Sequence, residues 1–283
     1  MQDIKLMIIG AGQMGTGIAQ VFLQQGFNVT LTDHKQENIH RATEHIQENL
    51  NKLVLKERLT TNEMEQLLVN LNSSIDLQVA SEMDFIIEAI SENATKKFKL
   101  LSDLGNLVKE DAIIASNTSS FSITELSTYV INPERFIGMH FFNPVPVMDL
   151  IEVVKGVHTS EQVSNFVFEL GKKLEKSPFY VNDSPGFVLN RILIPMINEA
   201  VFAVHEGVAD FKSVDTIMKL GANHPMGPIS LADFIGLDTC LAIMETLHEE
   251  LGDDKYRPCP LLRKYVRSGK LGRKTGEGFF HYK

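Results

Sequence analysis

The stretch IKLMIIGAGQMG, residues 4–15, decides the fold of the first part of the chain. A short apolar run leads directly into three glycines with the spacing GxGxxG, and apolar residues at helical spacing follow. In such a strand, turn and helix, Gly10 permits the tight turn, Gly12 lets the backbone approach a pyrophosphate, and Gly15 lets the helix pack closely on the strand. The motif therefore predicts a nucleotide-binding unit whose helix N-terminus holds the phosphates.

The residues that follow give this motif the context it requires. Gly26-Phe27-Asn28 ends the helix, Val29–Thr32 is typical of a second strand, and Asp33 closes that strand. Asp33 lies close to the spacing of about 20 residues at which a carboxylate accepts the adenosine ribose hydroxyls and repels a 2′-phosphate. NAD is therefore favoured over NADP. The alternative is an aspartate at a strand end that caps the next helix.

Residues 34 to about 70 form a longer segment than a plain crossover needs. Their apolar spacing predicts a pair of helices, which would make an inserted helical arm. Lys52 and Lys56 share one face of this arm, and Arg58 lies near its turn. From charge alone, a solvated helix face is the simpler interpretation of these cations.

A second informative stretch is GMHFFNPVPVMDLIEVV, residues 138–154. Its alternating pattern predicts a strand with His140 near the carboxyl end, where open α/β sheets bind ligands. After the prolines, the apolar residues 150–154 predict another strand, which can bring Glu152 beside the imidazole as its orienting partner. The alternative is a buried histidine that a carboxylate satisfies for structural reasons.

Further polar residues are expected at the same edge of the sheet. Strands are predicted at Asp84–Ile90 and Ala112–Ala115, and each ends in a polar loop. Glu92, Asn117 and Ser119 fall just after these strand ends, on the edge where the glycine loop lies. A loop rich in Ser and Asn is equally typical of a helix cap, so its position favours a binding role more than its composition does.

Strand signals stop at the turn residues 182–186, which indicate a domain boundary. The periodicity beyond this boundary is helical and covers the runs Val188–Glu206, Val214–Leu220, Leu231–Leu251 and Leu261–Arg267. We therefore expect a dinucleotide-binding domain over residues 1–183, with its arm at about 34–70, and an all-α domain over residues 184–283.

Composition excludes several classes of function. A formal net charge of −9 argues against nonspecific nucleic-acid binding, which depends on Lys and Arg. No run of about 18 apolar residues could span a bilayer, and the first residues do not resemble a signal peptide, so the cytoplasm is the expected location. Cys240 and Cys259 are too few for a disulfide framework, and no ligand cluster at metal-binding spacing predicts a metal site.

Six blocks resemble the L-3-hydroxyacyl-CoA dehydrogenase family in order and spacing, over nearly the whole chain. They are GAGQMGTGIA, ASNTSS, GMHFFNPVPVMDLIEVV, DSPGFVLNRIL, KLGANHPMGPISLADFIGLD and GRKTGEGFF. The resemblance implies an α/β fold, a Rossmann-type doubly wound sheet with an inserted helical arm, followed by an all-α C-terminal domain. It also implies NAD-linked interconversion of a (3S)-3-hydroxyacyl-CoA and a 3-oxoacyl-CoA, most closely as in bacterial enzymes that act on 3-hydroxybutyryl-CoA.

The resemblance assigns roles to four polar residues. His140 is expected to be the general base that takes the hydroxyl proton as hydride leaves the substrate. Glu152 is expected to hold the imidazole and stabilise its protonated form. Ser119 and Asn190 match positions that hydrogen-bond the substrate oxygen. Because Asn190 belongs to the second domain, domain closure would complete such a site.

The resemblance also implies binding sites for the cofactor and for CoA. The residues that match the family's dinucleotide site are Gly10, Gly12, Gln13, Met14, Gly15, Asp33, Glu92, Lys97, Asn117 and Asn143. For the nucleotide part of CoA, Lys56 matches the family's lysine on the arm, Lys52 accompanies it, and Asn49 stands where relatives often have serine. The family pairs through its helical domain, so a homodimer is expected.

Two other interpretations are open. A β-hydroxyacid or polyol-type dehydrogenase of similar architecture would use a lysine for proton transfer, and the helix after the boundary offers none before Lys212. A catalytically silent NAD-binding relative would be indicated by the loss of His140 or Glu152, and both are present. The fold alone does not establish activity.

Overall fold

The computed structural model describes residues 4–282. The chain divides into two compact units, of which the first ends at Asp183 and the second begins at Ser184. Each unit has its own hydrophobic core. Among the described residues, no helix is both long and apolar enough to cross a membrane.

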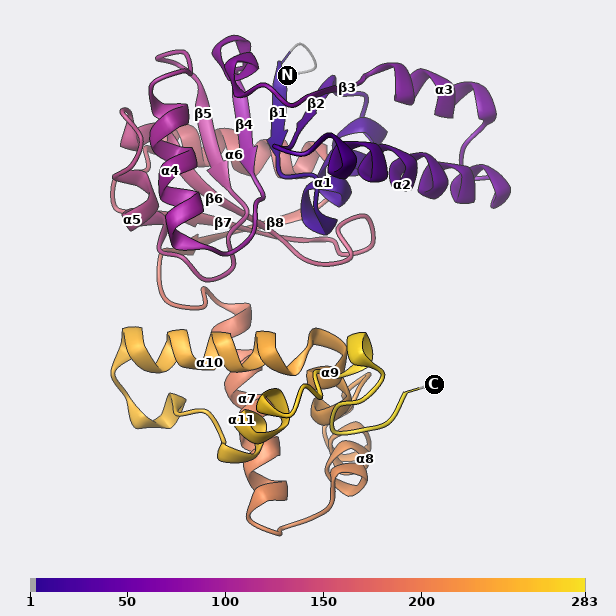
Figure 1. Cartoon of the computed structure of the whole chain (residues 1–283), viewed down its shortest axis with the longest axis vertical. Helices are drawn as coiled ribbons and strands as arrows, with labels where there is room; N and C mark the ends of the chain where they lie inside the picture. Colours follow the sequence, from indigo (N-terminus) through magenta and orange to yellow (C-terminus); the bar gives the residue numbers. More distant parts are fainter. Residues whose placement is uncertain (1–3, 283) are drawn as a thin grey trace. The chain divides into compact units, whose positions relative to one another are not determined.

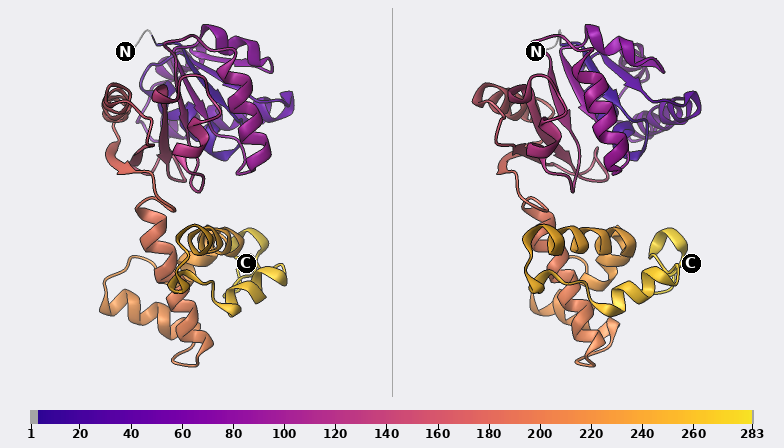
Figure 2. Two further views of the ribbon diagram at one scale, coloured as in Figure 1. Left: turned by 90° about the vertical axis from the view of Figure 1, so that its left-hand side faces the viewer. Right: turned by 60° about the vertical axis from the view of Figure 1, so that its left-hand side comes forward.

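One eight-stranded sheet with helices on both faces forms the first unit (Figure 1, Figure 2). Its strands are β1 (Leu6–Ile9), β2 (Val29–Thr32), β3 (Leu71–Ser74), β4 (Phe85–Glu88), β5 (Ile113–Ser116), β6 (Phe136–Phe141), β7 (Leu150–Lys155) and β8 (Ser177–Asn182). The order is β3-β2-β1-β4-β5-β6-β7-β8, and all neighbours pair in parallel except β6 and β7. The order reverses at β1, so a ligand crevice is expected at the carboxyl ends of β1 and β4.

Strand β3 is not predicted by the sequence pattern. Its residues, Leu71–Ser74, read LNSS and are all at least partly exposed. They pair in parallel with β2 at the edge of the sheet. An edge strand without a buried face shows no alternation of apolar and polar residues, so backbone pairing forms it where periodicity gives no signal.

The helices of the first unit are α1 (Gln13–Gln24), α2 (Gln36–Leu55), α3 (Thr61–Val69), α4 (Ala94–Gly105), α5 (Ile123–Ser127) and α6 (Glu161–Lys173). The predicted helical arm is the pair α2 and α3, which lie side by side (Figure 1). A buried stripe at helical spacing packs α2 against α1, and its members are Ile39, Ala42, Ile46 and Leu50. Thr60 and Glu63 form a capping box that starts α3.

The second unit is helical, and its helices are α7 (Leu189–His205), α8 (Phe211–Gly221), α9 (Pro228–Ile235), α10 (Leu237–Leu251) and α11 (Pro260–Arg267). The run Leu231–Leu251, predicted as one helix, belongs to two helices that meet at Gly236. Gly236 has φ 106°, a conformation that glycine adopts readily and a helix cannot contain. The helix therefore breaks there although the apolar periodicity continues.

Asp233 in α9 holds the C-terminal segment onto the second unit. Its side chain is 1% exposed. The carboxylate accepts hydrogen bonds from the backbone N–H groups of Phe279 and Phe280 and from the Tyr282 hydroxyl, each at 2.9 Å. A Cβ atom at Gly278 would lie 2.0 Å from this carboxylate, so only glycine leaves it room. Charge-assisted bonds to the backbone therefore tie the last residues to the helical core.

Asp233→Ala should lower the free energy of unfolding by about 3 kcal/mol, because one buried and two partly buried donors lose a charged acceptor. Thermal unfolding followed by circular dichroism should show this loss as a lower Tm. Tyr282→Phe is the matched control, since it removes one of the three bonds and should cost only about 1 kcal/mol. Equal losses in the two variants would contradict the role given to the backbone bonds.

Candidate active site

His140 and Glu152 face each other on β6 and β7. The antiparallel register sets one directly opposite the other. The His140 Nδ1 atom lies 2.8 Å from Glu152 Oε2, and the two residues are 5% and 3% exposed. An ionised carboxylate only accepts hydrogen bonds, so this contact places a proton on Nδ1 and the basic lone pair of a neutral ring on Nε2. The arrangement suits a general base with an orienting partner, and its catalytic use stays a prediction.

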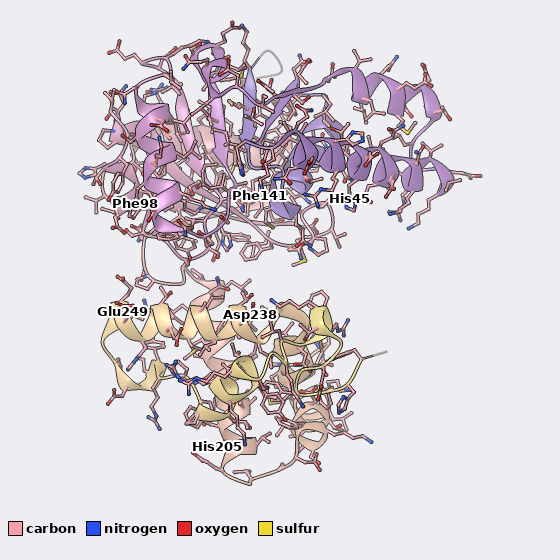
Figure 3. All side chains as sticks on the ribbon, in the orientation of Figure 1. His45, Phe98, Phe141, His205, Asp238 and Glu249 are labelled. Atoms are coloured by element: carbon pink, nitrogen blue, oxygen red, sulfur yellow. The ribbon has the colours of Figure 1, made fainter. Side chains whose placement is uncertain are left out.

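An aromatic ring packs on the imidazole of this pair, and the strands that carry the pair pack closely. Phe141 is on the other face of β6, where it is buried in the core of the first unit (Figure 3). The Phe142 ring lies 4.3 Å from the His140 imidazole, measured between centroids. A Cβ atom at Gly138 would lie 2.8 Å from the Val154 side chain, so the absent side chain lets the two strands pack closely. Burial of His140 and Glu152 lowers the local dielectric and strengthens the contact between imidazole and carboxylate.

The glycine turn before α1 has the close contacts that a dinucleotide turn requires. Gly10 has φ 109°, and a Cβ atom there would lie 2.5 Å from the carbonyl oxygen of Ala89. A Cβ atom at Gly15 would lie 1.8 Å from the Gly10 carbonyl oxygen, whereas nothing lies within 4 Å of one built at Gly12. The first two residues of α1 are Gln13 and Met14. Open space at Gly12 and a helix start with no side-chain cap fit a pyrophosphate.

Asp33 follows β2, and its carboxylate joins three segments. It accepts hydrogen bonds from the N–H groups of Ala11 and Lys35, both at 3.0 Å, and from the Asn38 amide at 2.9 Å. Burial alone would raise the pKa of Asp33, but these hydrogen bonds outweigh it and lower the pKa, so the group is ionised at neutral pH. The cap residue of α2 is Lys35, and its helix has no side-chain cap. Asp33 is therefore not the cap residue of α2, although its carboxylate bonds the Lys35 N–H and the Asn38 amide at the start of that helix.

A buried ion-pair network, not identified from the sequence, lies behind Glu92. Glu88 and Ser116 end β4 and β5 in register, and the Ser116 hydroxyl donates to Glu88 at 2.6 Å. The Lys97 ammonium in α4 donates to Glu88 at 2.7 Å and lies 3.4 Å from Glu92. Glu92 accepts the N–H of Ser119 at 2.8 Å. The network thus fixes the loop after β5. The sequence feature that could have indicated this network is the single charged residue, Glu88, in the apolar strand FIIE.

This network separates the predicted cofactor residues into two kinds. The Glu92 side chain is 38% exposed, whereas Lys97 is 1% exposed and enclosed behind it. Asn117 is also buried, and its side-chain oxygen accepts the N–H of Phe141 at 2.9 Å. Asn143 is exposed in the connection between β6 and β7. A ligand can therefore reach Glu92 and Asn143 directly, while the side chains of Lys97 and Asn117 support the edge.

On the helical arm, Lys52 and Lys56 are exposed, and Lys56 is the C-cap residue of α2. The Asn49 amide donates to the side-chain oxygen of Gln20 in α1 at 3.1 Å, and its own oxygen accepts from Lys52 at 3.3 Å. His45 lies on the same helix (Figure 3). Asn49 therefore braces the arm against α1, and the two lysines are the accessible cations among the residues predicted to bind CoA.

Ser119 and Asn190 belong to different units. Ser119 is partly buried in the loop after β5. Asn190 is partly buried in the first turn of α7. The N–H of Ser119 is bonded to Glu92, and Asn190 follows the first residue of α7.

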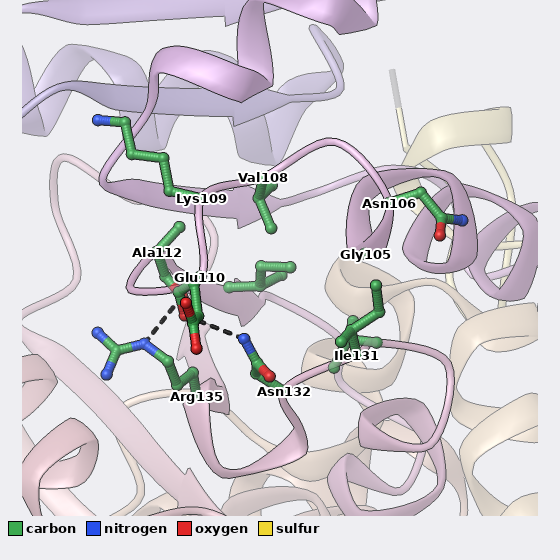
Figure 4. A pocket seen from close by; sticks show the side chains of 11 residues that line it. Gly105, Asn106, Val108, Lys109, Glu110, Ala112, Ile131, Asn132 and Arg135 are labelled. Atoms are coloured by element: carbon green, nitrogen blue, oxygen red, sulfur yellow. Dashed lines mark hydrogen bonds between the residues drawn. The ribbon is translucent and has the colours of Figure 1, made fainter.

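A pocket of about 300 Å³ lies near the amino end of β5, opposite the edge that carries the polar residues (Figure 4). Arg135 Nε donates to the Ala112 carbonyl oxygen at 3.2 Å, and the Asn132 amide donates to that of Glu110 at 3.0 Å (Figure 4). These side chains therefore stabilise the chain before β5. The pocket is lined by residues other than those predicted to bind cofactor or substrate.

The glycine turn, the reversal of strand order and the polar carboxyl edge define a dinucleotide-binding α/β protein with a helical second unit. Residues 5–184 match the family model of the 3-hydroxyacyl-CoA dehydrogenase NAD-binding domain. Residues 186–282 match the model of the 3-hydroxyacyl-CoA dehydrogenase C-terminal domain. The chain belongs to the 3-hydroxyacyl-CoA dehydrogenase family.

Individual relatives are similar over their whole length. A probable 3-hydroxybutyryl-CoA dehydrogenase of Deinococcus radiodurans is 55% identical over 279 residues, which cover 99% of this chain and 100% of the relative. A probable 3-hydroxybutyryl-CoA dehydrogenase of Bacillus subtilis is 49% identical over 282 residues, which cover 100% of this chain and 98% of the relative. The crystal structure of (S)-3-hydroxybutyryl-CoA dehydrogenase from Ralstonia eutropha matches with a TM-score of 0.97 and 46% identity. The match covers 99% of this chain and 100% of that structure's chain. The predicted family and fold class are confirmed.

Lys97→Met should lower the free energy of unfolding by about 3–5 kcal/mol, because it leaves the Glu88 carboxylate buried without its cation. Urea unfolding should show this loss. The double variant Lys97→Met/Glu88→Gln should recover much of it, since the second change removes the unpaired charge and keeps a hydrogen-bonding side chain. Losses that simply add would contradict a coupled ion pair.

Proposed function

We propose that this protein interconverts (3S)-3-hydroxybutyryl-CoA and acetoacetyl-CoA with NAD as the hydride carrier. The observation that carries the proposal is the buried contact between His140 and Glu152 at the carboxyl end of β6, in a sheet whose first turn fits a dinucleotide. The substrate is supported by relatives named for 3-hydroxybutyryl-CoA, which are similar over nearly the whole chain.

His140 is the acid–base residue in this proposal. A neutral imidazole whose Nδ1 is bonded to Glu152 takes the proton of the substrate 3-hydroxyl at Nε2. An alcohol is a poor hydride donor while it keeps that proton, so its removal favours departure of hydride from C3. Bound NAD⁺ supplies the hydride acceptor. Glu152 stabilises the imidazolium by a charge-assisted hydrogen bond, and in reduction His140 returns the proton to the new hydroxyl.

Further side chains are proposed to hold the substrate. Ser119 and Asn190 hydrogen-bond the oxygen on C3 and so orient the carbon for hydride transfer. The exposed ammonium groups of Lys52 and Lys56 bind the phosphates of the CoA nucleotide. Asn49 keeps the arm in place through its bond to Gln20. Support for the CoA contacts comes from the exposure of both lysines on one helical arm.

The proposed assembly is a homodimer formed through the second unit. Large apolar side chains are exposed on this unit, and they are Val188, Ile192, Val208, Ile217, Leu220 and Phe234. A partner that covers exposed apolar side chains removes them from water, which favours association. A second copy is proposed because symmetric pairing is the commonest assembly of soluble oligomers.

Replacing His140 with glutamine should lower kcat by about 10²- to 10⁴-fold, because the acid–base group is lost while the side chain keeps a similar size. The rate should be measured as NADH oxidation with acetoacetyl-CoA. Binding of NADH, followed by its fluorescence, should stay within about twofold of the unaltered protein, since catalysis and binding are separate readouts. Unchanged turnover would remove this histidine from the mechanism.

Asp33 is proposed to select NAD, because its ionised carboxylate accepts ribose hydroxyls and repels a 2′-phosphate. Asp33→Asn keeps an oxygen that can accept the N–H of Ala11 and removes the charge. We expect kcat/KM for NADH, divided by kcat/KM for NADPH, to fall by about tenfold to a hundredfold. The reason is that charge-assisted hydrogen bonds to the ribose hydroxyls are lost. An unchanged ratio would show that other residues select the cofactor.

A further inference from the structure

The connection between β6 and β7 joins the two strands that carry His140 and Glu152. Residues 142–149 form this connection, here called the hairpin loop. Its backbone folds on itself, since the Pro144 carbonyl oxygen accepts the N–H groups of Val147 and Met148 at 2.9 Å and 3.0 Å. The loop exposes Asn143, Val147 and Met148. The loop begins at Phe142, whose ring centroid lies 4.3 Å from that of the His140 imidazole, so a change in the position of the loop moves a group in contact with the proposed acid–base pair.

One anchor of the hairpin loop is apolar. Val145 is buried in the core of the first unit. Its side chain packs on Gly17 of α1, where an added Cβ atom would lie only 2.9 Å from Val145 Cβ. The loop is thereby joined to the helix that begins at the glycine turn.

A second anchor is polar and comes from Lys176. This residue lies between α6 and β8, after Glu175, whose φ of 57° makes the turn. The Lys176 ammonium donates to the carbonyl oxygens of Val145 at 3.0 Å and Met148 at 2.9 Å. A cation shared by two carbonyl groups of one loop holds both ends of that turn, and bonds from a charged donor are about twice as strong as neutral ones.

The surroundings of Lys176 change the pKa of its ammonium group. Burial lowers its pKa, and the carboxylate of Asp149 opposes that shift. Two charged residues precede Lys176 closely in the chain, Glu175 in the same turn and Lys173 at the end of α6, and the Lys173 ammonium lies 5.2 Å from the centre of the Phe27 ring. As the pH rises, Lys176 loses its proton earlier than an ordinary lysine, and its hold on the two carbonyl groups weakens.

We propose that Lys176 is a positioning residue for the dehydrogenase reaction: through two carbonyl oxygens it holds the hairpin loop in place, and with it Phe142, whose ring packs on the His140 imidazole. The inference rests on the proposed function, and it assigns the reaction a residue that lies beyond the pair itself. Positioning of this kind changes catalysis without contact between Lys176 and the substrate, since small displacements of reacting groups can cost about 10²-fold in rate.

The test compares Lys176→Met and Lys176→Arg with the unaltered protein in the oxidation of (3S)-3-hydroxybutyryl-CoA by NAD⁺, from about pH 6 to about pH 10. In this direction His140 accepts a proton, and a rise in pH does not impair a base, so a fall of activity at alkaline pH comes from another group. The unaltered protein should lose kcat/KM at alkaline pH. Lys176→Arg should keep its activity to higher pH, because a guanidinium stays charged.

Lys176→Met should lower kcat/KM by about tenfold to a hundredfold at neutral pH, where the unaltered side chain is charged. Lys172→Met is the matched control, since it removes the same charge from an exposed pair with Glu169 on α6 and should behave as the unaltered protein. Thermal unfolding of each variant separates loss of fold from loss of position.

Three outcomes would overturn the proposal: an alkaline fall in Lys176→Arg at the same pH as in the unaltered protein, normal kcat/KM in Lys176→Met, or a loss in that variant matched by Lys172→Met. Should Lys176→Met not fold, the pH profile of Lys176→Arg decides alone. Absence of activity in the unaltered protein would instead contradict the proposed function, so the two failures are distinguishable.

Discussion

The antiparallel pairing of β6 with β7 is the constraint on which the candidate site depends. Parallel neighbours need a crossover of a dozen or more residues, so groups on them come from distant parts of a chain. Here a short loop joins the two strands, and register alone sets the His140 ring opposite Glu152. Both residues are buried, and a buried carboxylate without a donor would be costly. The pairing therefore positions the imidazole and satisfies the charge in one arrangement.

The parallel part of the sheet holds a network of polar groups at its carboxyl edge. Glu88 and Ser116 end adjacent strands in register, and Lys97 closes the network from α4. One buried cation lies between two carboxylates, of which Glu92 is the exposed one. Because satisfied networks are rigid and half-satisfied ones are costly, the edge keeps its shape before a ligand arrives.

Periodicity predicted the strands with a buried face, the helical arm and the helical second unit, because burial leaves a repeating pattern in a sequence. It missed β3, whose residues bury no face, and the break at Gly236, where backbone conformation overrides an unbroken apolar pattern. The contact of His140 with Glu152 could be predicted from the sequence, because both residues lie on adjoining predicted strands. The contacts of Glu88 could not be predicted in this way. Strand register brings Ser116 to it and α4 brings Lys97, and only the fold specifies both placements.

Exposure also separates residues that a family resemblance treats alike. Asn117 and Lys97 match the family's cofactor site, yet the side chain of each is buried and already bonded within the protein. The buried Lys97 ammonium lies 2.7 Å from Glu88 and 3.4 Å from Glu92, so it can affect a ligand through Glu92 without contact. Matching positions therefore identify a site as a whole, and burial decides which of its residues are contacts and which hold the contacts in place.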